Sequence, residues 1–192
     1  RDSPDIGKIA FQFGTRPMIT KESPVSDAWK KVMMQVKKGD VILQKFSPTG
    51  FFSSAIKNTF LENLMRRKQG EVAFKNEPDD EFSHPLNMTE SKMIFIKPED
   101  AEKAVNQINA GYTEIKETPD NTVVFLTPAE WKQMKIDRAN CVGCLSQCQF
   151  STWSQAKGTT GRLPDPRSYC IHKTLYEVGH GGSVKDHLLF AG

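Results

Sequence analysis

Short apolar runs recur along the chain and predict buried strands. Each run spans four to six residues and gives way to a polar residue or a glycine, as expected where a strand meets a turn. By this criterion, strands are predicted at Ile9–Phe13, Val41–Phe46, Met93–Ile96 and Thr122–Leu126. These runs are separated by longer segments, whose own periodicity decides the class of fold.

Most of the separating segments place apolar residues at the three- and four-residue spacing of an amphipathic helix. Ser26–Val36 has Ser26 or Asp27 available as its cap. Pro98–Ala110 opens with a proline and is followed by Gly111, the residues typical of the two ends of a helix. The pattern predicts further helices at Ser54–Lys68, Pro128–Met134 and Tyr169–His180, whereas the polar stretch Gly70–Glu90 indicates an exposed loop.

The alternation of strands with helices indicates an α/β fold with largely parallel strand pairing. The predicted strands are too few to close a barrel, so we expect either part of a barrel with an added lobe or a small open sheet. The chain begins at Arg1 without a methionine and stops just after the apolar run Leu188–Ala191. We therefore expect both ends to lie inside a longer polypeptide, the rest of which would be a partner of this chain.

Composition narrows the class of protein. The chain has 192 residues, of which 38% are hydrophobic and 26% charged, and its mean hydropathy of −0.50 fits a soluble globular protein. A net charge of +3 without a block of five like charges argues against a nucleic-acid partner. No apolar run approaches the ~20 residues of a membrane span, and no secretory leader is visible. Neither nucleic acid nor a membrane is expected as a partner.

The stretch Phe11–Arg16 (FQFGTR) has two interpretations. Gly14 and Thr15 follow the predicted first strand, and a glycine there can simply turn the chain into the next element. In parallel α/β proteins, however, ligands bind beyond the carboxyl ends of strands, and backbone N–H groups in such a turn bind phosphate. The tripeptide Gly-Thr-Arg alone favours the plain turn.

Four cysteines form the second group with candidate chemistry: Cys141, Cys144, Cys148 and Cys170. They are too few for the disulfide framework of a secreted protein, so a reducing compartment, the cytoplasm, is expected. A Cys-x-x-Cys turn lets two thiolates bind one tetrahedral metal, and four thiolates suit Zn²⁺ or an iron–sulfur cluster. Two alternatives stay open: a redox-active dithiol, and reduced cysteines that pack as small apolar groups.

Three stretches resemble a known family. FQFGTRPMITKESPVSDAWKK resembles the last barrel strand and following helix of the nitronate monooxygenase family, the 2-nitropropane dioxygenase-like flavoproteins. Phe11–Arg16 and Glu22–Pro24 match in order and spacing, while Pro17 stands where the family has phenylalanine. KFSPTGFFSSAIKNTFLENL and WSQAKGTTGRLPDP resemble later segments of the same proteins. The likeness covers residues 9–68 and resumes from residue 150 onward.

The resemblance implies a TIM barrel with a small lid domain that binds FMN and oxidises alkyl nitronates with O₂. A related branch of the family reduces enoyl-acyl carrier proteins with NAD(P)H. By matching positions, Gln12, Gly14 and Thr15 would hold the FMN phosphate, and the loop from Gly158 to Gly161 would approach the flavin from the lid. The histidine base of the family belongs to earlier barrel strands, so the catalytic residue is expected upstream of this chain.

The same resemblance divides the chain into three parts. Residues 1–40 would end the FMN-binding barrel with its last strand and helix, residues 41–150 would form the lid or insert lobe, and residues 151–192 would return to the barrel as a loop and a helix. The fold expected on this basis is the carboxyl-terminal part of a TIM-barrel flavoprotein with an added α/β lid lobe.

The remaining polar and aromatic residues carry weaker indications. No histidine has the serine and aspartate context of a hydrolase. A modest basic surface is predicted, which is either a solvated helix face or a contact for a dinucleotide phosphate or an acidic carrier protein; its residues are Lys45, Lys57, Arg66 and Arg67. The three tryptophans are interpreted as packing residues: Trp29, Trp131 and Trp153.

Overall fold

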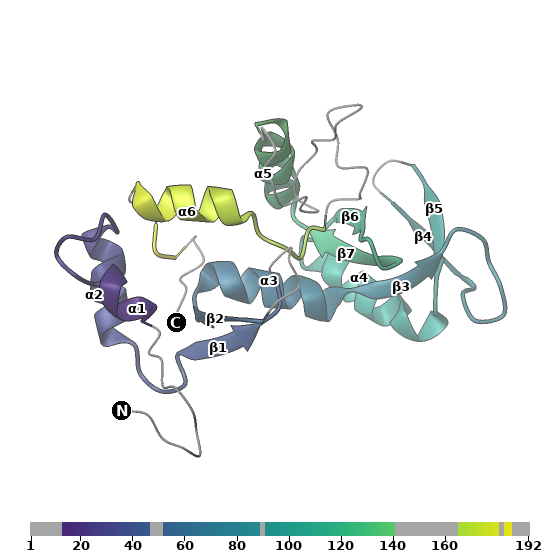
Figure 1. Ribbon diagram of the computed structural model, residues 1–192. Coiled ribbons are helices and arrows are strands. Elements are labelled where there is room, and N and C mark those ends of the chain that lie inside the picture. The colour runs from purple at the N-terminus through teal and green to yellow at the C-terminus, as the bar shows by residue number, and fades with distance from the viewer. Residues whose placement is uncertain (1–12, 47–51, 89–90, 141–164, 181–182, 186–192) are drawn as a thin grey trace, which may run out of the picture. The chain divides into compact units, whose positions relative to one another are not determined.

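The computed structural model describes residues 13–46, 52–88, 91–140, 165–180 and 183–185 (Figure 1). These residues form two compact units. Unit 1 comprises the described residues up to Lys45, then Phe52–Leu61 and those from His172 onward, and unit 2 comprises Phe46 and Glu62–Ile171. Each unit has its own buried apolar cluster. The assignment of these units to a barrel and a lid stays a prediction.

Unit 1 is a small α/β assembly. Its elements are α1 (Thr15–Met18), α2 (Asp27–Gln35), β1 (Val41–Gln44), β2 (Ser53–Ile56), the first residues of α3 (Thr59–Gly70) and all but the first residue of α6 (Ile171–Gly179). Strands β1 and β2 pair antiparallel. As predicted, Ser26 caps α2 by accepting the N–H of Trp29. Helix α2 buries Trp29 and Met33 beside Ile56 of β2, and these residues form the core of the unit.

An asparagine fastens the start of α3 within unit 1. Its Oδ1 accepts the N–H of Leu61 at 3.0 Å, while its Nδ2 donates to the carbonyl of Val184 at 2.9 Å; the residue is Asn58. Next to it, the backbone N–H of Phe60 donates to the carbonyl of Lys185 at 3.0 Å. An Asn side chain that caps a helix satisfies one of the amides left open in the first turn.

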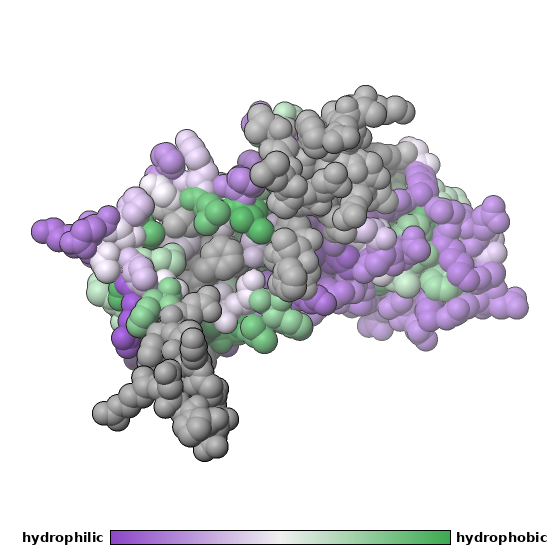
Figure 2. All heavy atoms as spheres, in the orientation of Figure 1, coloured by the Kyte–Doolittle hydropathy of each residue, from purple (hydrophilic) through white to green (hydrophobic). Residues whose placement is uncertain are grey.

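Apolar side chains stay exposed on unit 1. Figure 2 shows apolar colour gathered over β1, β2 and α6. Large exposed apolar residues of these segments, with the residue directly before β2, are Leu43, Phe52, Leu175 and Tyr176. All four are more than half exposed, whereas Thr174 of α6 is buried. Helix α6 therefore turns its polar threonine inward and part of its apolar surface outward.

Unit 2 is built on a five-stranded antiparallel sheet with the strand order β4-β5-β3-β7-β6. Its strands are β3 (Val72–Lys75), β4 (His84–Asn87), β5 (Met93–Ile96), β6 (Glu114–Glu117) and β7 (Thr122–Leu126). A 3-10 turn η1 (Pro98–Asp100) leads into α4 (Ala101–Asn109), and α5 (Pro128–Ala139) follows β7. Strand β7, which lies between β3 and β6, is buried on both faces, since Val123 to Leu126 are at most 1% exposed.

Alternating residues of the strands build the core of unit 2. Side chains that point to one face of the sheet pack with Ala104 of α4, and they are Val72, Phe74, Ile94, Ile96, Ile115, Val123 and Phe125. This two-residue period on the strands and the matching face of α4 make a two-layer core. Helix α4 ends as predicted at Gly111, whose φ of +92° allows its N–H to reach Ile108 while Tyr112 reaches Gln107. This is the Schellman arrangement.

Several sequence predictions are wrong. All strand pairs in the described residues are antiparallel, whereas largely parallel pairing was predicted. The paired strands β1 and β2, β4 and β5, and β6 and β7 follow one another without a described helix between them, as antiparallel hairpins allow. The predicted loop Gly70–Glu90 contains β3 and β4 and the buried Phe82. The predicted helix Ser54–Lys68 begins as strand β2, and β6 was not predicted. The predicted strand Ile9–Phe13 lies outside the described residues apart from Phe13, which is not in a strand.

Other predictions are confirmed. Strands β5 and β7 have the predicted bounds. Both ends of α2 lie within one residue of the prediction, those of α6 within two and those of α4 within three, while α5 begins at the predicted residue and ends five residues later. Among the described residues, no helix combines the length and the apolar character needed to cross a bilayer.

Candidate functional site

The Gly14 corner is open to solvent at the start of α1. Gly14 is exposed, Thr15 is half-buried, and no side chain caps the helix. The carbonyls of Thr15 and Arg16 both accept the N–H of Ile19 at 3.3 Å, so they point along the helix and away from Gly14. The N–H groups of a first helical turn point the opposite way, toward the cap. Gly14 itself is exposed at this corner.

The other predicted cofactor and metal residues are mostly outside the described part of the chain. This applies to Gln12, Gly158, Gly161, Cys141, Cys144 and Cys148. Cys170 is described and lies half-buried directly before α6. Within the described ranges, no three His, Cys, Asp or Glu side chains are grouped as metal ligands would be. Of the predicted site residues that the structure describes, only the chain neighbours Gly14 and Thr15 lie together.

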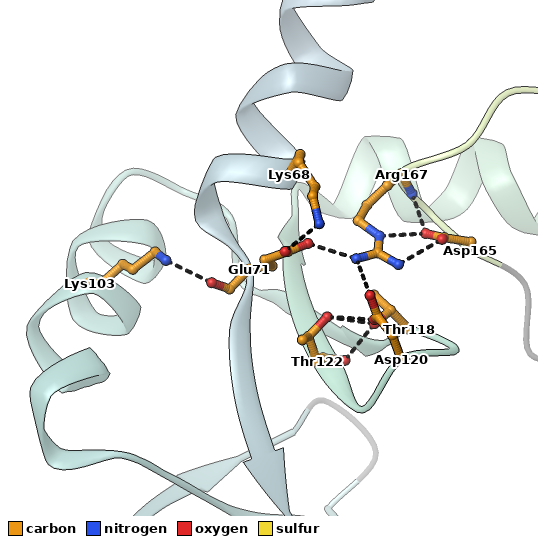
Figure 3. Close-up of polar contacts among 8 residues, drawn as sticks. All are labelled: Lys68, Glu71, Lys103, Thr118, Asp120, Thr122, Asp165 and Arg167. Atoms are coloured by element: carbon orange, nitrogen blue, oxygen red, sulfur yellow. Dashed lines mark hydrogen bonds and ion pairs between the residues drawn. The ribbon is translucent and has the colours of Figure 1, made fainter. Parts of the chain in front are cut away.

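A cluster of charges around Arg167 is the most extensive polar arrangement in unit 2 (Figure 3). The Arg167 side chain is only 10% exposed. Its Nε and Nη2 donate to the two oxygens of Asp165 at 2.9 and 2.8 Å, a bidentate pair. Its Nη1 donates to Glu71 at 2.7 Å and to Asp120 at 2.9 Å. One guanidinium therefore joins carboxylates from three separate segments of the chain.

Each carboxylate of the Arg167 cluster has a local reason for its position. Asp165 lies two residues before Arg167 and also accepts the backbone N–H of Arg167 at 2.9 Å. Glu71 stands between α3 and β3, where its carbonyl accepts Lys103 at 2.7 Å. Asp120 sits in the turn between β6 and β7, which closes because Asn121 adopts a φ of +58°. Asparagine is one of the few residues that tolerate this conformation.

Two hydroxyl groups hold Asp120 in its turn. Thr118 and Thr122 both donate to Asp120 Oδ1, and the N–H of Thr118 donates to the carbonyl of Thr122 at 2.8 Å. Burial alone would raise the pKa of Asp120, but hydrogen bonds from Arg167 and the two threonines outweigh it and hold this pKa well below its usual value. The carboxylate is therefore ionised at neutral pH.

A second ion cluster lies beside the first. Glu130 of α5 accepts Arg67 at 2.7 Å and Arg66 at 3.3 Å. Arg67 also donates to the carbonyl of Pro166 at 2.9 Å, so it contacts the same segment as Arg167. Burial would raise the pKa of Glu130, but the charge of Arg67 and the N–H of Thr127 lower it overall. The basic surface predicted from Arg66 and Arg67 is thus an internal ion cluster.

The chemistry of these two clusters is structural. Each cation meets a carboxylate or a carbonyl, and neither cluster contains a histidine, cysteine or serine that could act as a nucleophile or base. The two clusters hold the segment Asp165–Arg167 against the sheet. Their members are far apart in the chain, so the sequence pattern does not reveal these clusters. The one local signal is Asp165-Pro166-Arg167, in which an aspartate and an arginine are two residues apart.

Trp131 on α5 has cations on several sides. Lys116 Nζ lies 4.3 Å from the centre of its ring, Arg138 Cζ 5.0 Å and Lys135 Nζ 5.1 Å. Burial lowers the pKa of Arg138 from its usual value. Trp131 was interpreted from the sequence as a packing residue. A signal for the surrounding cations was available, because Lys135 and Arg138 follow Trp131 at helical spacing.

No known protein-family model, curated protein or solved structure matches this chain significantly.

Proposed function

We propose that this chain is the carboxyl-terminal portion of an FMN-dependent oxidoreductase that oxidises alkyl nitronates with O₂. The observation that supports the proposal is the ordered match of Phe11–Arg16 and Glu22–Pro24 to the nitronate monooxygenase pattern. The exposed Gly14 at the start of α1 is compatible with this match, because a phosphate can reach the backbone there.

In this proposal the residues around Gly14 bind the cofactor and do not carry out the reaction. Backbone N–H groups at Gly14 and Thr15, with the hydroxyl of Thr15, donate to the phosphate, and the missing side chain of Gly14 lets the phosphate approach. Gln12 contributes an amide group from the preceding residues. When bound, FMN supplies the electron-transfer chemistry, and the protein supplies orientation and exclusion of water. The proton-abstracting base lies upstream of Arg1.

The test replaces Gly14 in the full polypeptide. Gly14→Val places a branched side chain where the phosphate would approach, and we expect FMN affinity to fall at least about tenfold, since each hydrogen bond to a charged group contributes about 1.5–3 kcal/mol. The matched control is Gly179→Val, because a Cβ at that exposed position meets nothing within 4 Å. Flavin absorbance per protein and far-UV circular dichroism are measured for both variants.

The outcomes separate the proposal from its alternatives. Flavin lost from Gly14→Val and kept by Gly179→Val, with unchanged circular dichroism, supports the phosphate assignment. Full flavin content in Gly14→Val contradicts it. Consumption of NAD(P)H with an enoyl thioester, in place of O₂ with a nitronate, would indicate the reductase branch. Stoichiometric zinc or a brown iron–sulfur spectrum without flavin would indicate a metal centre at the cysteines.

A further inference from the structure

Strand β1 has an open edge. The N–H of Lys57 donates to the carbonyl of Asp40 at 2.8 Å, which fixes which pairs of the β1–β2 ladder are hydrogen-bonded. Bonded and non-bonded pairs alternate along an antiparallel ladder, so Val41 and Leu43 turn their N–H and C=O groups away from β2. Among the described residues, no further strand pairs with β1 and no hydrogen bond joins another residue to these outward groups. Such a row of backbone groups can pair with another strand.

The side chains beside this edge are first apolar and then cationic. Val41 packs against the core of unit 1, whereas Leu43, two residues further on the same face, is 66% exposed. Lys45 follows at the same spacing and is exposed as well. Its Nζ lies 5.5 Å from the centre of the ring of Phe52, a residue that is 64% exposed, and the face of an aromatic ring attracts a cation. We call Leu43, Lys45 and Phe52 the hairpin patch.

Unit 1 carries more positive charge than its own acids balance. Its described residues include ten lysines and arginines but four aspartates and glutamates. Within this described part of unit 1, Lys173 alone forms an ion pair, with Glu177 at 3.2 Å. In unit 2, by contrast, most of the described cations are joined to carboxylates. The excess cations of unit 1, with Lys45 among them, therefore present a positive field to an approaching partner.

We propose that the open edge of β1 binds an extended acidic peptide segment of a partner protein, which adds a third strand to the hairpin. The outward N–H and C=O groups of Val41 and Leu43 supply the main-chain hydrogen bonds, the side chain of Leu43 supplies an apolar contact, and Lys45 meets a carboxylate. A two-stranded hairpin gains stability from a third strand. The positive charge of unit 1 favours an acidic segment over a basic one and speeds its approach.

Other occupants of this edge fit the observations less well. A second copy of the chain would bring its own Lys45 and the excess positive charge of its own unit 1, and like charges repel. A lipid surface could meet the side chains of the hairpin patch, but it has no backbone to pair with the edge. The proposed site uses neither Gly14 nor a cofactor, so it holds or fails independently of the proposed flavin binding.

The test is calorimetric titration of the full chain with an acidic peptide whose ends are blocked, Glu-Thr-Val-Thr-Val-Thr-Glu. Its valines and glutamates point to one face of an extended strand. We expect saturable binding that weakens as salt is raised. A peptide with lysine in place of both glutamates should bind at least about fivefold more weakly. Two further versions carry N-methyl groups, one on the valines and one on the threonines. Each blocks one edge of the extended peptide, so one version should lose binding and the other should keep it.

Charge reversal on the protein tests the contact with the carboxylate. Lys45→Glu should weaken binding of the acidic peptide at least about fivefold, because a pair of opposite charges across two strands becomes a pair of like charges. The matched control is Lys31→Glu on α2. Lys31 is exposed and lies two residues from the buried Trp29 and Met33, so it is on the opposite face of the helix. This variant should change affinity no more than about twofold.

A proline on each edge of the hairpin tests the main-chain pairing. Leu43→Pro removes an outward N–H of β1 and should weaken binding at least about fivefold, whereas the ladder with β2 does not use that N–H. Ser54→Pro makes the same change on the outward edge of β2 and should leave affinity within about twofold. Thermal unfolding shows whether each variant is folded. If Leu43→Pro does not fold, the N-methylated peptides decide the question on the parent chain.

Several results would overturn the proposal. They are the absence of saturable binding of the acidic peptide, equal affinity for the acidic and lysine peptides, unchanged binding of both N-methylated peptides, and equal losses within either pair of variants. If the acidic peptide does not bind and phosphatidylserine vesicles do, the hairpin patch meets a lipid surface. If the peptide does not bind and the chain forms a dimer that Leu43→Pro abolishes, the edge pairs with a second copy.

Discussion

Arg167 shows how much one side chain can organise in this protein. Its five donors form a rigid planar fork, and the structure occupies that fork with Asp165, Glu71 and Asp120. A lysine would offer the same charge but could not make the parallel pair with Asp165. Because the arginine is buried, its partners matter more than those of a surface ion pair. Removing Arg167 would take the cation away from Asp165 and Asp120, while Glu71 would keep its pair with Lys68.

We therefore expect Arg167→Ala to lower the free energy of unfolding by about 3 kcal/mol or more, the usual range for one lost partner of a buried ion pair being about 3–5 kcal/mol. Arg167→Lys should lose less, because it keeps the charge. The control is Lys75→Ala, which breaks the exposed pair with Asp79 and should cost under about 1 kcal/mol. Urea unfolding measures all three. Equal losses for Arg167→Ala and Lys75→Ala would show that the cluster does not stabilise the fold.

Two partly buried carboxylates with lowered pKa predict how stability depends on pH. Asp120 and Glu130 both bind protons less readily in the folded chain than in the unfolded one. Their contribution is therefore complete above the unfolded values near 4 and is lost as the pH falls toward the folded values. We expect the free energy of unfolding to be level between about pH 5 and 7 and to fall below about pH 4.

Asp120→Asn tests the origin of this acid sensitivity. The variant should be less stable at pH 7 and should show a shallower decline between about pH 4 and 2, because the neutral amide has no proton to gain. Asp80→Asn, at an exposed position, serves as the control and should leave the decline unchanged. A decline that is as steep in Asp120→Asn as in the parent chain would place the acid-sensitive groups elsewhere.

At the scale of elements, α5 depends on its first turn. Thr127 Oγ1 accepts the N–H of Glu130 at 3.2 Å, and Glu130 Oε2 accepts the N–H of Thr127 at 2.8 Å. This reciprocal pair satisfies two amides that a helix start leaves open. It also aims Glu130 at Arg66 and Arg67, so the cap joins the helix to the ion cluster.

Thr127→Ala should therefore destabilise the chain by about 1 kcal/mol, within the range of about 0.5–2 kcal/mol known for lost caps. Thr127→Ser keeps the hydroxyl, so its loss of stability should be only a few tenths of the loss caused by Thr127→Ala. Urea unfolding of the two variants gives the comparison. If serine fails to preserve stability, the methyl group of Thr127 rather than its hydroxyl is what the fold requires.

The elements that sequence predicted correctly are those whose signals are local. Strand β7 is apolar from Val123 to Leu126 because it lies between two other strands and is buried, and Gly111 ends α4 because few other residues adopt its φ. Strand β6 was missed because Glu114–Glu117 is mostly charged, with Lys116 turned toward Trp131. Strand β4 was missed because His84–Asn87 is an exposed edge strand that contains Pro85. Edge strands need little apolar character, so periodicity does not reveal them.

At the scale of the whole chain, pairing direction and the ion clusters could not be predicted. Parallel pairing requires a crossover between neighbouring strands, and only tertiary contacts show that α4 instead links β5 to a strand two positions beyond β3 in the sheet. The contact between Glu71 and Arg167 joins residues 96 positions apart, and no local pattern reports it. The motif around Gly14 lies in one short stretch of sequence, so its resemblance is visible there, and its role as a phosphate site stays a prediction.

That long-range contact leads to a prediction for the size of the folding unit. A fragment of residues 46–171 contains both ion clusters, whereas a fragment of residues 46–140 lacks Arg167, so that Asp120 loses its cation and Glu71 keeps its pair with Lys68. We expect the longer fragment to unfold cooperatively in urea and the shorter one to be less stable by about 3 kcal/mol or more. Arg167→Ala in the longer fragment should reproduce most of that difference, because the same carboxylates lose the same partner. If the truncation costs far more than the substitution, contacts other than the Arg167 cluster hold residues 165–171 to the sheet; if it costs nothing, the sheet folds without them.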